Sequence, residues 1–144
     1  PAERALDYVA GYTIFNDGTL RDYQKRAKQW TLGKNFDASG ACGPAVVTAD
    51  ALPAGASGLR LTTELNGEVM QDGRTDDLIF SVAELVAAAS EVMTLEPGTL
   101  IATGTPPGVG MARDPYVWLK PGDTVAITIA GIGTLRNPVV GETG

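Results

Sequence analysis

The sequence predicts a mainly β domain with helical insertions, an α+β fold. Between residues 59 and 65, apolar or threonine side chains alternate with polar ones, and Asn66-Gly67 then provides the strongest short signal for a β-hairpin. Two further short apolar segments are bounded by Pro-Gly and Gly-x-Gly turns. Only two stretches have helix signals. We therefore expect strands to dominate and the helices to be insertions between them.

The first half of the chain begins with a short strand that leads into a helix. The strand is expected over residues 8–15, and Thr19 is expected to cap a helix that runs to about Gln29, with Asp22 in its first turn. Residues 51–58 are rich in Ala, Gly, Pro and Ser and are expected to be a surface loop. The hairpin then pairs residues 59–65 with residues 68–71.

The second half is expected to contain one helix and two more strands. Ser81 and Glu84 form a capping box ahead of an apolar helix that ends before Pro97. Strands are expected over residues 99–103 and 125–129. Turns are expected at residues 121–122 and 131–133.

Length, charge and composition exclude several classes of function. The 144 residues suit one hydrophobic core, and the net charge of −6 comes without a basic patch outside residues 21–34, which argues against nucleic acid as a partner. No apolar run approaches the roughly 20 residues that cross a bilayer, so we expect no membrane partner and a cytoplasmic protein. A single cysteine and no histidine exclude an internal disulfide and a zinc site.

Residues 11–36 concentrate the polar groups that suggest chemistry. Asp17, Arg21, Gln24 and Lys34 place an acid, a guanidinium, a carboxamide and an ammonium around the start of the expected helix. This grouping suits an anionic substrate held near a hard metal ion.

Each of these residues also has an ordinary structural interpretation. Asp17 can be a helix cap instead of a metal ligand, and Lys34 can be a surface lysine. Arg21 and Gln24, three residues apart, share one helix face, which can be a substrate-binding face or simply a solvated one.

The glycine-rich segment over residues 103–110 is not a phosphate loop. It lacks the Gly-Lys-Ser/Thr ending, and its two prolines remove backbone donors that a phosphate cradle needs. A tight turn remains an alternative to a binding role for this segment.

Several motifs together resemble those of a known enzyme family. They are the Asn-Asp-x-x-x-Arg-Asp-x-Gln pattern at residues 16–24, Gly-Lys-x-Phe-Asp at 33–37, ATGTPPGVG at 102–110, KPGD at 120–123 and GIGTLRNP at 131–138. In this order they resemble the C-terminal catalytic domain of the fumarylacetoacetate hydrolase family, from about residue 8 to residue 140. Residues 18–20 depart from the family, because Gly-Thr-Leu stands where many relatives carry Val-Ser-Ala.

The resemblance implies a mixed, mostly antiparallel β-roll, a homodimer and a role for each site residue. Asp17 would bind a divalent cation, Mg²⁺ or Mn²⁺. Arg21, Gln24 and Thr105 would contact a small 2-oxo acid substrate, and Lys34 would stabilise developing negative charge as a catalytic residue. Relatives complete the metal site with an upstream Glu-x-Glu pair, and many add a His-x-x-Glu pair that activates water.

This chain contains neither upstream pair. Residues 1–144 are therefore expected to be a catalytic domain that lacks its N-terminal part. For the full protein, the resemblance implies metal-dependent hydrolysis of a carbon-carbon bond in a 2-oxo acid of the acylpyruvate type, from aromatic catabolism. Two alternatives stay open: decarboxylation or isomerisation of a related 2-oxo dicarboxylate, and a non-catalytic remnant or binding subunit.

Overall fold

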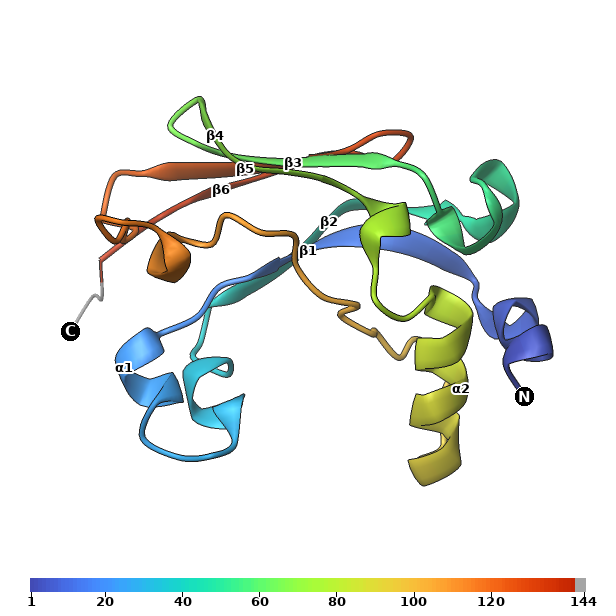
Figure 1. The fold of residues 1–144 in the computed structure, drawn as a ribbon. Helices are drawn as coiled ribbons and strands as arrows, with labels where there is room; N and C mark the ends of the chain where they lie inside the picture. The colour runs from blue at the N-terminus through green and yellow to red at the C-terminus, as the bar shows by residue number, and fades with distance from the viewer. Residues whose placement is uncertain (142–144) are drawn as a thin grey trace.

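The structure, a computed structural model, describes residues 1–141, and these form two antiparallel sheets with short helices around them (Figure 1). The smaller sheet pairs β1 with β2, and the larger has the order β4-β3-β5-β6. The strands are β1 (Gly11–Asp17), β2 (Gly40–Thr48), β3 (Arg60–Leu65), β4 (Glu68–Arg74), β5 (Thr124–Ile129) and β6 (Gly133–Pro138). The helices are α1 (Arg21–Gln24) and α2 (Val82–Val92), with 3-10 turns η1 (Ala2–Tyr8), η2 (Trp30–Gly33), η3 (Ala49–Ala51), η4 (Ala54–Ala56), η5 (Thr75–Asp77) and η6 (Gly110–Ala112).

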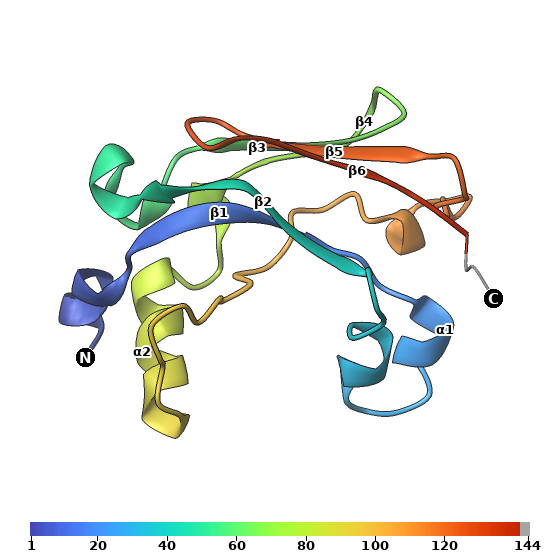
Figure 2. The same cartoon turned by 180° about the vertical axis from the view of Figure 1, so that it is seen from behind.

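The hydrophobic core lies where the smaller sheet crosses the larger one. Ile14 of β1 is 1 % exposed and packs among apolar side chains of β5, β6 and the turn between them. Figures 1 and 2 show α1 and α2 near opposite ends of the β1–β2 sheet, on its side away from the larger sheet. The predicted mainly β, α+β fold is confirmed, and every strand pair is antiparallel.

The register of the smaller sheet determines where the first insertion leaves and rejoins it. Asp17 at the end of β1 pairs with Gly40 at the start of β2. Residues 18–39, which include α1 and η2, therefore leave and return at one point. Asn16, the preceding residue, donates from Nδ2 to Oδ1 of Asn137 in β6 at 3.1 Å, which links this end of β1 to the larger sheet.

Several predicted elements are confirmed, and two are wrong. The hairpin turns at Asn66-Gly67, and the Ser81–Glu84 capping box begins α2. However, the first helix ends at Gln24 instead of Gln29, and Thr19 does not cap it, because its hydroxyl donates to the Asp17 carbonyl at 3.2 Å. Residues 99–103 form no strand, since no described segment pairs with them. Strands β2 and β6 were not expected.

The early end of α1 has a tertiary cause. A Cβ placed on Gly33 would lie 2.7 Å from Cβ of Gln24 and 2.8 Å from the carbonyl oxygen of Leu20. The chain therefore turns after α1 and packs η2 back against it at van der Waals contact. This packing overrides the helix propensity of the residues that follow Gln24.

The chain exposes more surface than a compact monomer of the same mass. Its accessible area is 9796 Å². A compact monomer of this mass exposes about 7,000 Å². The apolar helix α2 has no buried residue, and Ile79 just before it is 91 % exposed. None of the helices among residues 1–141 has the length and apolar character to span a membrane.

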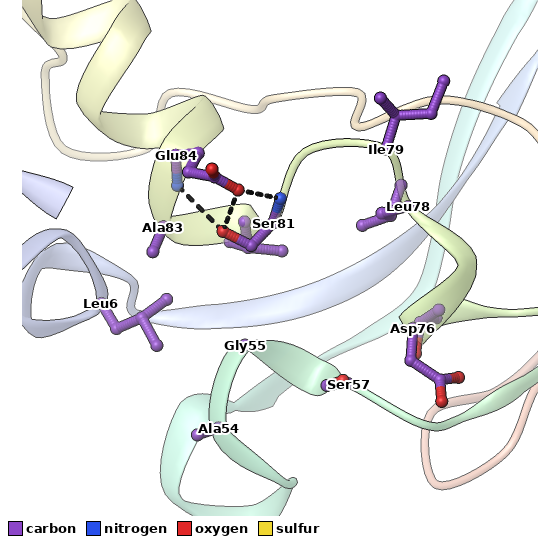
Figure 3. A pocket seen from close by; sticks show the side chains of 12 residues that line it. Leu6, Ala54, Gly55, Ser57, Asp76, Leu78, Ile79, Ser81, Ala83 and Glu84 are labelled. Atoms are coloured by element: carbon purple, nitrogen blue, oxygen red, sulfur yellow. Dashed lines mark hydrogen bonds between the residues drawn. The ribbon is translucent and has the colours of Figure 1, made fainter. Parts of the chain in front are cut away.

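The N-terminal end of α2 faces a hollow of about 310 Å³, bordered by Leu6 and Gly55 (Figure 3). Two backbone N–H groups at this helix end are already engaged. Ser81 Oγ accepts from the Glu84 backbone N–H at 3.3 Å, and the Glu84 carboxylate accepts from the Ser81 backbone N–H at 2.7 Å. Because Asp76 and Glu84 also line this hollow, it does not favour an anion.

We expect Asn66→Ala to lower the melting temperature by several degrees. Asn66 has φ of +53°, and its side chain donates to Asp123 and accepts from the Thr124 N–H, both at 2.8 Å. Alanine loses both hydrogen bonds and tolerates positive φ poorly. Thermal unfolding measures the effect, and Asn66→Gly, which relieves the backbone but loses the same bonds, separates the two contributions.

The loss of thermal stability in Asn66→Ala should depend on pH. Hydrogen bonds from the Asn66 amide and then the Lys120 backbone N–H hold the pKa of the Asp123 carboxyl below its ordinary value. The resulting stabilisation is present above the carboxyl's unfolded pKa and disappears as pH falls through its lowered folded pKa. The difference in melting temperature between the native protein and Asn66→Ala should therefore narrow on acidification. A difference that stays constant would contradict this assignment.

Candidate active site

Asp17 and Lys34 meet at the end of β1. The Lys34 ammonium forms an ion pair with Oδ2 of Asp17, and the two side chains are 25 % and 46 % exposed. The turn after Asp17 is held tightly, because a Cβ on Gly18 would lie 2.1 Å from the carbonyl oxygen of Ser39. In this chain, the absence of a side chain at Gly18 therefore allows the backbone to pass close to Ser39.

The position of Lys34 follows from the packing of η2 on α1. Leu20 donates its backbone N–H to the Gly33 carbonyl at 3.0 Å, which fixes the residue immediately before Lys34. On the other side, Phe36 meets the ring of Tyr23 edge-on, with centroids 4.7 Å apart. The ammonium is thus held over the end of β1 by contacts that precede and follow it.

Arg21 and Gln24 form a second pair, in α1. Arg21 donates from its guanidinium to Oε1 of Gln24 at 2.8 Å, and Gln24 is only 5 % exposed. Because a guanidinium can only donate, this contact determines which amide atom faces Arg21. The amide nitrogen of Gln24 is consequently left available as a donor to a ligand.

The pair borders a surface hollow of about 320 Å³, whose lining also includes Trp30 and Met111. Met111 belongs to η6, at the end of the segment that leads away from α2 (Figure 1). The segment that carries the glycine-rich motif therefore reaches the edge of the α1 hollow.

Thr105 lies on that segment and is held from β4. Its hydroxyl accepts a hydrogen bond from Nε2 of Gln71 at 2.9 Å. Among the described residues, no hydrogen bond or ion pair joins Thr105 to Asp17 or to Lys34. The structure thus brings Asp17 together with Lys34 and Arg21 together with Gln24, and places Thr105 in a separate contact.

Sequence reasoning missed two residues that hold the glycine-rich segment. Gln71 bonds Thr105, and Arg113 donates to the carbonyl of Gly108 at 3.1 Å and to that of Met70. The sequence signal was the two prolines, which remove backbone donors and so limit the hydrogen bonds that the segment can make by itself. Nothing in the spacing indicated which distant side chains supply them.

The comparisons with known proteins agree on the family. The family model described as fumarylacetoacetate (FAA) hydrolase C-terminal matches residues 1–140. This chain belongs to the fumarylacetoacetate hydrolase family. The match covers the β1 end, the α1–η2 insertion and the glycine-rich segment.

Relatives in the family have named enzyme activities. The oxaloacetate tautomerase YisK of Bacillus subtilis is 47 % identical over 95 % of this chain and 45 % of its own length. The fumarylacetoacetate hydrolase of Exiguobacterium antarcticum superposes with a TM-score of 0.93, at 42 % identity, over 99 % of this chain and 50 % of that one.

A third relative, the maleylpyruvate hydrolase of a Sphingobium strain, has a TM-score of 0.81 and 34 % identity, over 96 % of this chain and 47 % of that one. The solved structures share the β-rich fold described above. The chain spans about half the length of the relatives it matches.

The metal that the family implies does not fit the described residues alone. Within residues 1–141, no three acidic, cysteine or histidine side chains gather closely enough to hold an ion. Asp17 offers one carboxylate, and its Oδ2 is already engaged by Lys34. Since hard cations require several oxygen ligands, these residues could supply only part of a metal site.

We therefore expect the 144-residue chain to bind Mg²⁺ weakly, and a protein extended by the region that the relatives possess beyond the match to bind it much more tightly. Titration calorimetry on both proteins measures the difference. Asp17→Asn should abolish the additional affinity of the longer protein. Tight binding by the short chain would show that the ligands lie elsewhere.

Proposed function

We propose that the protein containing this chain is a metal-dependent enzyme that stabilises the enolate of a small 2-oxo acid. The observation that carries the proposal is the Arg21–Gln24 pair at the α1 hollow. Because Arg21 already donates to the amide oxygen of Gln24, most of the groups that this pair leaves for a ligand are N–H donors. A site made of donors selects an anion or a carbonyl oxygen.

The roles of the side chains follow from their chemistry. The planar guanidinium of Arg21 suits the carboxylate of the substrate, and the amide nitrogen of Gln24 can donate to the 2-oxo oxygen. The Lys34 ammonium, held beside Asp17, can stabilise negative charge that grows as the enolate forms. A divalent cation, Mg²⁺ or Mn²⁺, would add Lewis-acid polarisation of the same oxygens, with Asp17 among its ligands.

Hydrolysis of an acylpyruvate is the first candidate reaction. Hydroxide from water adds to the acyl carbonyl, the carbon-carbon bond breaks, and its electron pair becomes the pyruvate enolate. A proton then converts the enolate to pyruvate. The maleylpyruvate hydrolase among the relatives acts on a substrate of this class by its name, which supports hydrolysis.

Isomerisation of a 2-oxo dicarboxylate is the second candidate. It requires only that a proton move between carbon 3 and the carbonyl oxygen, through the same enolate and without water. The relative named oxaloacetate tautomerase supports this candidate. Assays of keto–enol exchange and of acylpyruvate cleavage on one preparation separate the two reactions.

We also propose that residues 1–144 are part of a longer catalytic domain in a cytoplasmic homodimer. The exposed area exceeds that of a compact monomer of this size by roughly 2,800 Å². An excess of this size is typical of a surface that is buried permanently by further protein. The exposed apolar helix α2 is the clearest part of that surface.

Oxalate and pyruvate should inhibit the longer protein competitively, since both present the carboxylate and neighbouring oxygen of a 2-oxo acid. Steady-state kinetics at several inhibitor concentrations measure this. Oxalate binding without turnover of any 2-oxo acid would instead support the non-catalytic alternative. Failure of both compounds at millimolar concentration would contradict the proposed substrate class.

Lys34→Met should lower kcat about a hundredfold and change KM much less, as expected for the loss of one charged donor at a transition state. Methionine keeps the apolar stem and removes the charge. Lys120→Met, at an exposed turn, is the matched control and should retain activity. Kinetics and thermal unfolding measured together separate catalysis from folding, and an unchanged kcat at unchanged stability would remove Lys34 from the site.

A further inference from the structure

The glycine-rich segment is held by one side-chain amide of β4. Nε2 of Gln71 lies 2.9 Å from the Thr105 hydroxyl oxygen and 2.7 Å from the Pro106 carbonyl oxygen. Gln71 is half-buried, whereas Thr105 is exposed at the surface of the segment. A single amide nitrogen therefore bridges two consecutive residues.

The Pro106 contact determines the direction of the Thr105 hydrogen bond. A carbonyl oxygen can only accept, so the amide atom that faces it must be the nitrogen of Gln71. That nitrogen can only donate, and the Thr105 hydroxyl must therefore accept from it. Gln71 therefore does not engage the hydroxyl proton, which stays available for another acceptor on the exposed residue Thr105.

The surrounding backbone holds this arrangement firmly. A Cβ on Gly73 would lie 2.9 Å from the Pro106 ring, and one on Gly108 would lie 2.2 Å from the Met70 carbonyl oxygen. The segment thus rests directly on β4 at Pro106 and at Gly108, the two points of close approach that follow Thr105. The same logic applies to Gln24, whose amide nitrogen is left as a donor by Arg21.

We propose that Gln71 is a positioning residue that holds the Thr105 hydroxyl as a hydrogen-bond donor to the carboxylate of the substrate. This inference rests on the proposed function and adds to it that the substrate carboxylate also reaches Thr105. Gln71 itself does not touch the ligand. It engages one acceptor position of the hydroxyl before the ligand arrives and leaves the hydroxyl proton available, which suits a carboxylate in that place.

A purely structural role for Gln71 makes a different prediction, and Arg113 provides the comparison. Arg113 fastens the same segment through the carbonyls of Gly108 and Met70 without contacting Thr105. If Gln71 only fastens the segment, its loss should act independently of the Thr105 hydroxyl, as the loss of Arg113 does. If it orients the hydroxyl, its effect should depend on that hydroxyl.

The test is a double-mutant cycle in the longer protein, with the dissociation constant of oxalate and the KM and kcat of a 2-oxo acid as readouts. We expect Gln71→Leu and Thr105→Val each to weaken oxalate roughly tenfold, as for one hydrogen bond to a charged group. The double variant should be no weaker than Thr105→Val alone. Arg113→Met combined with Thr105→Val should instead multiply the two single effects.

Thr105→Ser adds a rescue arm. Serine keeps the hydroxyl, so oxalate should bind nearly as in the native protein when Gln71 is present and about tenfold more weakly with Gln71→Leu. Gln71→Glu, which keeps the size but makes the side chain an acceptor, serves if Gln71→Leu does not fold. It should weaken oxalate at least as much.

The outcomes separate the two proposals. Failure of the native protein to bind oxalate would overturn the proposed function and this inference with it. Native binding of oxalate with independent effects of Gln71→Leu and Thr105→Val would overturn only the role of Gln71. Unchanged affinity in Gln71→Leu at unchanged melting temperature would do the same.

Discussion

The burial of Ile14 between the two sheets is the constraint on which the candidate site depends. At 1 % exposure, this side chain fixes β1 across the larger sheet, and the Asn16–Asn137 hydrogen bond holds the same end of β1 against β6. Asp17 then pairs with Gly40, so the insertion over residues 18–39 leaves and rejoins the sheet at one position. This single strand pairing therefore returns the insertion, which carries Arg21, Gln24 and Lys34, to the end of β1, where Lys34 pairs with Asp17.

The polar side chains of the site are oriented by other protein groups before any ligand is present. Arg21 occupies the acceptor atom of Gln24, and Gln71 occupies the hydroxyl oxygen of Thr105 as an acceptor. In both pairs the partner donates at the contact, so a donor of the oriented residue stays available: the amide N–H group of Gln24 and the hydroxyl proton of Thr105. Donors fixed in advance stabilise negative charge without reorganisation when that charge develops, which is the usual basis of enolate stabilisation in enzymes.

The open surface relates this chain to the greater length of its relatives. The smaller sheet has only two strands, α2 lacks a buried residue, and the accessible area exceeds that of a compact protein of this mass. The matched relatives are about twice as long as the matching stretch. The single carboxylate at Asp17 and the exposed helix α2 both support the proposal that further protein completes the site and the fold.

Local chemistry in the sequence determined the hairpin, the capping box and strand β5, because Asn66-Gly67, Ser81 with Glu84 and the apolar run of β5 act on immediate neighbours. The order of the motifs along the sequence also indicated which polar residues lie around β1. Only the tertiary structure decided the length of α1, since Gly33 packs against Gln24 from across a turn. The roles of Gln71 and Arg113 were equally hidden, because each contacts a segment more than 30 residues away in the chain. Such contacts depend on how the sheets bring distant strands together, which no local pattern of residues encodes.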